Sequence, residues 1–179
     1  MKPEKAPYYV ILFALVFWGA SLYNRYDKIV FDEPELFQNT SPQIEKGSTR
    51  WGHRTAGLRA DLIEPGTLVR FKTRRSVREL TARVVARSGE RVKIEAGKVF
   101  VDGAEGNDKY CRSHNGRDFL PEMIVPEGCL FVLNDKRYRD TCDRLDSRTL
   151  GPIPLGSVKH VFSAEPKRKR QRGGGGKRK

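Results

Sequence analysis

The chain has 179 residues and a formal net charge of +13, from 35 Lys and Arg against 22 Asp and Glu. The last thirteen residues, KRKRQRGGGGKRK, hold eight of the positive charges, so the rest of the chain carries only +5. The charge therefore does not indicate a nucleic-acid-binding domain, and no specific nucleic-acid partner is expected. Three cysteines are too few for a disulfide scaffold, and their spacing with the three histidines resembles no metal site. The sequence also lacks a Gly-rich phosphate loop, so we expect neither a metal nor a cofactor.

The first predicted element is an apolar helix at the N-terminus. Residues 7–23 read PYYVILFALVFWGASLY, with no charge inside the run and Lys or Arg on both sides. Seventeen residues is near the lower limit for crossing a hydrocarbon core of roughly 30 Å. Tyr and Trp lie near both ends, where their rings prefer the membrane interface. We predict one uncleaved transmembrane anchor, with a cleaved signal peptide or a buried core helix as alternatives.

Short β-strands are predicted after this segment, because apolar and polar residues alternate between Gly and Pro turns. The pattern favours an all-β barrel or folded sheet, and only residues 76–86 show a weak helical alternative. Residues 37–50 are polar and turn-rich, and residues 103–122 are expected to form a long surface loop. The predicted strands cover residues 28–34, 68–71, 80–85, a hairpin at 92–101 around Ala96–Gly97, 129–133 and 157–162.

The chain is therefore divided into three parts. Residues 1–24 form the tail and anchor, residues 25–164 form the β domain, and residues 165–179 form a disordered basic tail. The tail is a candidate ligand for anionic membrane lipid or, without sequence preference, for nucleic acid; a purely solvated end is the third interpretation. Cys129 is expected in the core, and a Cys111–Cys142 disulfide is possible if the domain is exported.

Residues 125–158 read VPEGCLFVLNDKRYRDTCDRLDSRTLGPIPLGSV and resemble the last conserved block of the type I signal peptidase family. Residues 65–71, 82–92 and 99–103 are similar to other blocks of that family, and residues 115–121 are similar to its conjugative-transfer branch. The resemblance implies a single-pass protein of the cell membrane with a mainly β domain on the outer, periplasmic or extracellular side. The matching residues of the first block are Pro126, Gly128, Phe131, Val132, Asp135, Arg137, Asp146, Ser147, Arg148, Gly151, Ile153 and Pro154.

The family is implied to use a Ser-Lys dyad, in which a neutral lysine accepts the proton of the serine hydroxyl. The lysine position directly precedes Arg-Val and is Ala82 here. The serine position aligns on Asn39, or on Gln43 by the conjugative-transfer pattern, and Ser41 is the nearest hydroxyl. A methyl group accepts no proton, so the resemblance predicts a chain that has lost its dyad.

Five other residues are expected to support the site. The resemblance places Asp135, Asp146, Ser147 and Arg148 beside it, and we expect an ion pair and hydrogen bonds that hold the loop beneath the site. Thr141 is the candidate for a helper hydroxyl if the loop after Asp135 is longer than in the family.

The sequence thus predicts a membrane-anchored signal-peptidase-like protein that binds an exported preprotein segment, or a partner peptidase, without cutting. One alternative is an active processing peptidase with a rearranged pair such as Ser41 and Lys72, including one that processes pilin precursors in conjugative transfer. The other is a non-enzymatic membrane assembly subunit.

Overall fold

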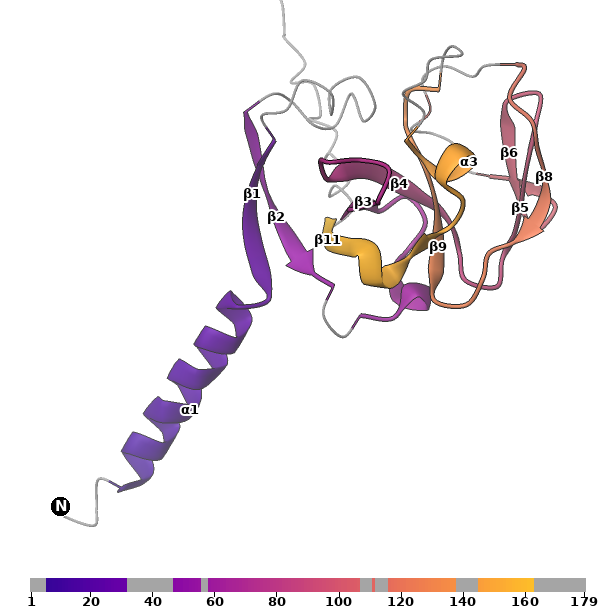
Figure 1. Ribbon diagram of the computed structural model, residues 1–179. Coiled ribbons are helices and arrows are strands. Elements are labelled where there is room, and N and C mark those ends of the chain that lie inside the picture. Colours follow the sequence, from indigo (N-terminus) through magenta and orange to yellow (C-terminus); the bar gives the residue numbers. More distant parts are fainter. Residues whose placement is uncertain are drawn as a thin grey trace, which may run out of the picture.

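The computed structural model describes residues 6–31, 47–55, 58–106, 111, 116–137 and 145–162. Helix α1 (Ala6–Tyr23) projects from a body made of two antiparallel sheets (Figure 1). The prediction of a mainly β domain behind an N-terminal helix is confirmed at this level.

The larger sheet has seven strands and the smaller has four, and neighbouring strands in both pair antiparallel. The larger runs in the order β1 (Tyr26–Phe31), β2 (Ser48–Arg54), β11 (Val158–Phe162), β3 (Leu68–Phe71), β4 (Leu80–Arg87), β9 (Cys129–Leu133), β10 (Ile153–Pro154). The smaller runs β7 (Ala104–Glu105), β6 (Lys98–Val101), β5 (Arg91–Glu95), β8 (Leu120–Ile124). The short helices are η2 (Ala60–Leu62), α3 (Ser147–Leu150) and η3 (Leu155–Ser157).

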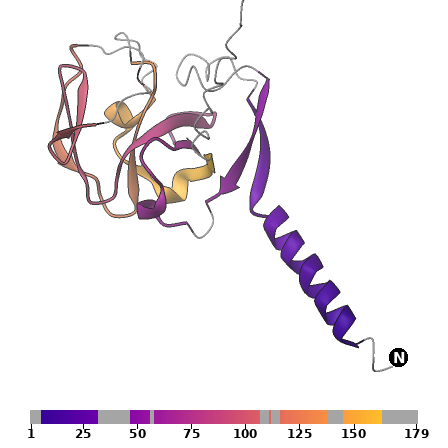
Figure 2. The ribbon, with the colours of Figure 1, turned by 180° about the vertical axis from the view of Figure 1, so that it is seen from behind.

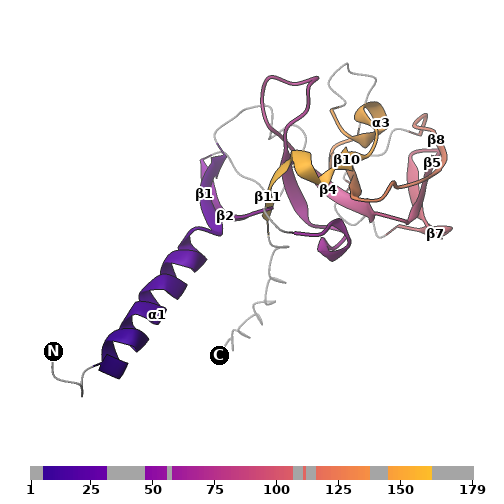
Figure 3. The ribbon, with the colours of Figure 1, turned by 60° about the horizontal axis from the view of Figure 1, so that its bottom comes forward.

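Helix α1, the larger sheet and the smaller sheet follow one another in that order. Seen from behind, the smaller sheet is at the end of the body opposite α1 (Figure 2). The view from below agrees, with α1 leaving beside β1 and β2 and with β5, β7 and β8 on the far side (Figure 3). The larger sheet therefore separates the smaller sheet from the helix.

Strand β9 contributes side chains to two apolar clusters, one on each of its faces. Successive side chains of a strand point to opposite faces, so Leu130 and Val132 pack into the cluster inside the larger sheet. Phe131 and Leu133 face the other way and pack against the smaller sheet. The strand is buried on both faces, which accounts for its unbroken apolar run.

The predicted N-terminal helix is present, but its expected role as a transmembrane span is not borne out. Its 18 residues rise about 27 Å, which is less than a hydrocarbon core of roughly 30 Å. Over the part of the chain that the structure describes, no helix is both long and apolar enough to cross a bilayer.

The remaining predictions of strands and loops can be compared with the observed elements. Strands β1, β3, β4, β9 and β11 and the β5–β6 hairpin are confirmed near their predicted bounds. The weak helical alternative at 76–86 is wrong, because β4 occupies its second half. The expected loop at 103–122 is partly wrong, since β7 and the start of β8 lie within it, and β2 was not predicted.

Cys142 and the basic tail lie outside the described residues, whereas Cys129 packs partly buried against the core as expected.

Candidate functional site

Ala82 lies in β4 at the position where the family resemblance expects the base. Strand β4 pairs with β3, which sets Ala82 opposite Val69. The alanine is fully buried and belongs to the apolar cluster inside the larger sheet, with Val84 and Val132. A methyl group in this interior neither donates nor accepts a proton. The position therefore contributes packing and no acid-base chemistry.

Arg83, the next residue along β4, points to the other face and is buried as an ion pair. Its Nε and Nη2 each donate to the Asp135 carboxylate at 2.7 Å, and its Nη1 donates to the Gly66 carbonyl at 2.6 Å. Only 6% of the Arg83 side chain and 1% of the Asp135 side chain are exposed. Bidentate pairing with an added carbonyl acceptor is the geometry that a buried guanidinium requires. The pair joins β4 to the end of β9.

Asp146 and Ser147 attach α3 to the free edge of β9. Asp146 is the N-cap of α3, and its Oδ1 accepts the Arg148 backbone N–H at 3.0 Å. Its Oδ2 accepts the Asn134 N–H at 3.1 Å, and Ser147 Oγ accepts the Val132 N–H at 2.9 Å. These two N–H groups lie beyond the short pairing with β10, so side chains replace the missing strand.

Arg148 ties this segment to the loop before β8. Its guanidinium pairs with Asp146 at 2.7 Å and with Asp118, whose carboxylate is also buried. Burial lowers the pKa of Arg148, but the hydrogen bonds and charges of Asp146 and Asp118 outweigh it and raise the pKa above its usual value. The arginine stays cationic between two carboxylates, and it connects the larger sheet to the smaller one.

The structure brings together four of the predicted site residues: Asp135 and Asp146 flank the end of β9, and Ser147 and Arg148 follow in α3. Asn39, Gln43, Ser41 and Thr141 lie outside the described residues, so their predicted roles stay predictions. Among the described residues, no group of His, Cys, Asp and Glu side chains is arranged to hold a metal.

Sequence reasoning missed two members of this cluster. Arg83 is not among the predicted site residues, although an arginine inside an alternating apolar strand is itself a signal of a buried partner. No sequence pattern near Asp118 indicates its role, because its partner Arg148 lies 30 residues away and meets it only in the folded protein. The side chains that form this cluster all make hydrogen bonds within the protein; they are Arg83, Asp118, Asp135, Asp146, Ser147 and Arg148.

One family model and two known proteins are similar to this chain. The family described as signal peptidase, peptidase S26, matches residues 1–161. Thylakoidal processing peptidase 1, chloroplastic, from Arabidopsis thaliana is 32% identical over 76 residues. That match covers 42% of this chain but only 21% of the relative, so the chain spans about a fifth of its length. The crystal structure of a signal peptidase I from Enterococcus faecalis V583 is 22% identical with a TM-score of 0.46, covering 56% of this chain and 96% of the other.

Proposed function

Because the chain belongs to the signal peptidase family, peptidase S26, we propose that it binds exported preprotein segments, or a partner peptidase, without cleaving them. The observation that carries the proposal is Ala82, a fully buried alanine where the family resemblance expects the general base. A serine or other hydroxyl without a neighbouring base is a poor nucleophile at neutral pH. Loss of the base alone is enough to remove hydrolysis by the family's route.

The assignment of Ala82 to the base position is supported by its neighbours. Arg83 follows it directly, as in the family's Lys-Arg-Val block, and reaches Asp135 in the last block. Asp146 and Arg148 then pair within that last block. A one-residue shift of the alignment would assign the base position to Thr81 or Arg83, and neither side chain can act as the base, because a threonine hydroxyl is a weak base and Arg83 is held as a cation by Asp135.

The ligand we propose is a precursor polypeptide, which is the substrate class that the family implies. We propose further that α1 attaches the chain to a membrane and that the β domain lies on the outer side. The described side chains of α1 from Tyr8 to Ser21 are uncharged and exposed, and no part of the described β domain covers them. Burying such a surface in a lipid environment is favourable because it removes apolar area from water.

The alternative of a rearranged pair, Ser41 with Lys72, receives no support from Lys72. A lysine acts as a general base only when burial or a neighbouring cation keeps it neutral. The Lys72 side chain is exposed at the start of the β3–β4 connection, so it lacks the burial that such a base needs. We therefore place non-cleaving binding ahead of rearranged catalysis.

The test is cleavage of a fluorogenic preprotein peptide by the full chain in detergent, beside the double variant Asn39→Ser, Ala82→Lys. We expect saturable peptide binding without cleavage in the natural chain, measured by fluorescence anisotropy, and cleavage in the double variant. Ala82→Met is the matched control, since it adds a long side chain at the same buried position without an amine. Cleavage by the natural chain that disappears in Ser41→Ala would refute the proposal, and so would failure of the natural chain to bind.

A further inference from the structure

The connection between β3 and β4, residues 72–79, is rich in positive charge. It reads KTRRSVRE, with four Lys or Arg residues and one acidic residue. The exposed cations are Lys72, Arg74, Arg75 and Arg78. The acidic residue, Glu79, forms an ion pair with Arg70 of β3, with 2.7 Å between Oε2 and Nε. The connection holds no other carboxylate that could balance its cations, and within the described residues Lys72 and Arg74 form no ion pair.

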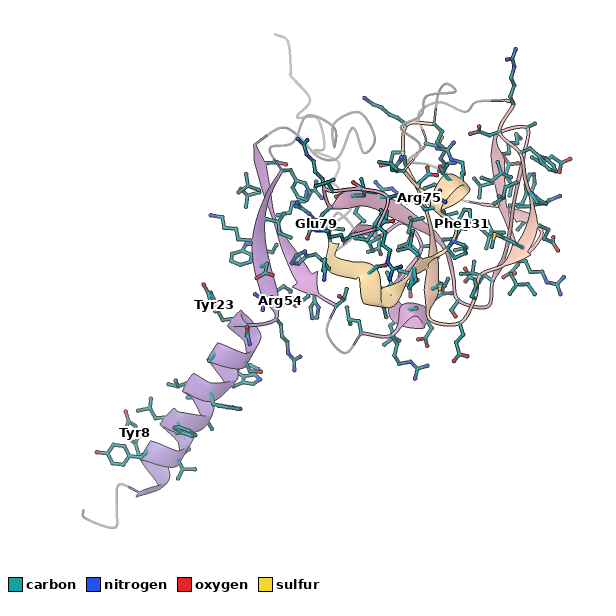
Figure 4. All side chains as sticks on the ribbon, viewed as in Figure 1. Tyr8, Tyr23, Arg54, Arg75, Glu79 and Phe131 are labelled. Atoms are coloured by element: carbon teal, nitrogen blue, oxygen red, sulfur yellow. The ribbon has the colours of Figure 1, made fainter. Side chains whose placement is uncertain are left out.

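Hydrogen bonds tie this connection to itself and to α3. Thr73 Oγ1 accepts the Arg75 N–H at 3.3 Å. Ser76 Oγ accepts the Arg78 N–H at 3.2 Å and donates to the Arg78 carbonyl at 2.9 Å. Arg75 Nη1 donates to the Thr149 carbonyl at 3.0 Å, and the side-chain view shows Arg75 beside α3 (Figure 4). A segment that is ordered before it binds a ligand loses less conformational entropy on binding.

Val77 adds an apolar side chain to the connection and is 95% exposed. In the view from below, the connection lies on the side of the body opposite α1, so a membrane reached by the helix does not cover it (Figure 3). One exposed valine by itself needs no explanation. Among four cations it fits a partner that carries both carboxylates and apolar side chains, as a polypeptide does.

Two carboxylates lie close to α3, but they do not neutralise this surface from outside. Asp118 and Asp146 both pair with Arg148, and their side chains are only 5% and 0% exposed. A ligand that approaches the connection therefore meets exposed cations and no exposed carboxylate of this cluster.

The connection leads directly into an open edge of β4. Residues 80–82 pair with β3 on one side, whereas the pairing of β4 with β9 begins only at Arg83. Within the described residues, the second side of 80–82 therefore has no strand partner, and an extended polypeptide can pair with such an edge. A polypeptide that lies along Ala82 reaches the connection about three residues farther on, because both chains advance about 3.3 Å per residue.

We propose that the β3–β4 connection binds an acidic segment of the precursor polypeptide, a few residues from the part that lies along β4. The proposal rests on the precursor binding proposed above and adds a sequence feature that selects among precursors. Carboxylates of the ligand face Lys72 and Arg74, and an apolar side chain of the ligand meets Val77. Complementary charge contributes to specificity and to the rate of association more than to affinity.

The test uses fluorescein-labelled peptides that share one precursor segment and differ only in an added tetrapeptide. The tetrapeptide is Asp-Glu-Asp-Glu or Gln-Gln-Gln-Gln, placed at the N-terminal end in one pair of peptides and at the C-terminal end in another. Binding to the full chain in detergent is measured by fluorescence anisotropy. We expect tighter binding of the acidic peptide in at least one pair, and a smaller difference at high salt, because salt screens exposed charges.

The double variant Lys72→Gln, Arg74→Gln should weaken binding of the acidic peptide about threefold per residue and leave the glutamine peptide unchanged. Arg25→Gln, Lys28→Gln is the matched control, because it removes the same charge from two exposed residues at the start of β1. The basic tail is present in every variant, so its attraction for acidic peptides cancels in the comparison. The charge reversal Lys72→Glu, Arg74→Glu should make the glutamine peptide the tighter ligand.

The outcomes separate this proposal from the proposed function. Equal binding of acidic and glutamine peptides by the natural chain refutes the acidic preference and leaves precursor binding standing. Failure to bind the glutamine peptides refutes precursor binding and, with it, this proposal. Equal losses in the two double variants would assign the preference to overall charge and overturn the proposal. It would also be overturned if Lys72→Gln, Arg74→Gln weakened binding of a single-stranded oligonucleotide but not of the acidic peptide.

Discussion

Replacing Asp135 by asparagine tests whether the buried ion pair holds β4 to the end of β9. Both carboxylate oxygens of Asp135 accept hydrogen bonds from Arg83 at 2.7 Å, and neither side chain is appreciably exposed. The asparagine amide has the shape of the Asp135 carboxylate but no charge. Its NH₂ group donates hydrogen bonds and would face the Arg83 guanidinium, which also donates. Arg83 then keeps its hydrogen bond to the Gly66 carbonyl but loses the counter-charge of Asp135.

The expected loss of stability follows from that geometry. Removing the carboxylate takes the Asp135 counter-charge away from a buried cation, which costs about 3–5 kcal/mol of unfolding free energy. Solvent screening does not reduce this figure much, because the Asp135 side chain is 1% exposed. Removing both charges, as Arg83→Met with Asp135→Leu, should recover most of the loss, since an apolar pair of similar volume avoids the desolvation penalty.

Urea unfolding of the full chain in detergent measures the effect by fluorescence, in a Trp18→Phe background that leaves Trp51 as the only tryptophan of the sequence. With a slope of about 2 kcal/mol per molar urea, Asp135→Asn should lower the midpoint by about 2 M. Glu105→Gln is the surface control, because the Lys98–Glu105 pair is more than half exposed and should contribute less than about 1 kcal/mol. A midpoint shift for Asp135→Asn no larger than that of the control, or a double variant less stable than the single one, would refute the reasoning.

Two other predictions concern the junction of β1, β2 and β11. Gly52→Ala should destabilise the protein by about 1–3 kcal/mol, because the added Cβ would lie 2.9 Å from Ile29 Cδ1, whereas Gly156→Ala meets no atom within 4 Å and serves as the control in thermal unfolding. Asp27 has a pKa held below its usual range by hydrogen bonds from Arg54 and then His160. A lowered folded-state pKa stabilises the fold above the unfolded-state value of about 3.9, and this contribution is lost as pH falls below it. Melting temperatures from pH 6 to pH 3 should therefore fall less steeply for Asp27→Asn than for the natural chain, and parallel curves would contradict this.

The elements predicted from sequence are those whose signal is local. The hairpin around Ala96–Gly97 is an example, since both residues adopt positive φ, at 49° and 78°, as a two-residue turn between twisted strands requires. Strand β9 was recognisable because a short unbroken apolar run between turns indicates burial on both faces. In each case the residues of the element itself are enough to predict it.

Strand β2 could not be predicted in this way, because STRWGHR has no apolar alternation. It lies inside the sheet, second from one edge, only because β1 and β11 pair with its two sides. On its inner face Gly52 leaves room for Ile29 and Phe162, which supply the apolar cover that β2 itself lacks. Strand β8 was missed for a similar reason: it is an edge strand with Pro121 inside it, and its pairing to β5 is made by backbone groups.

The candidate site also has residues that the sequence indicates and contacts that depend on the fold. Motif spacing is a property of the chain, so Ala82 and the residues Asp146, Ser147 and Arg148 can be assigned before the fold is known. The pairing of Arg83 with Asp135 across 52 residues, and of Arg148 with Asp118 across 30, depends on the fold. Ion-pair partners are selected by which strands lie side by side and which faces are buried, and this depends on the packing of the whole domain.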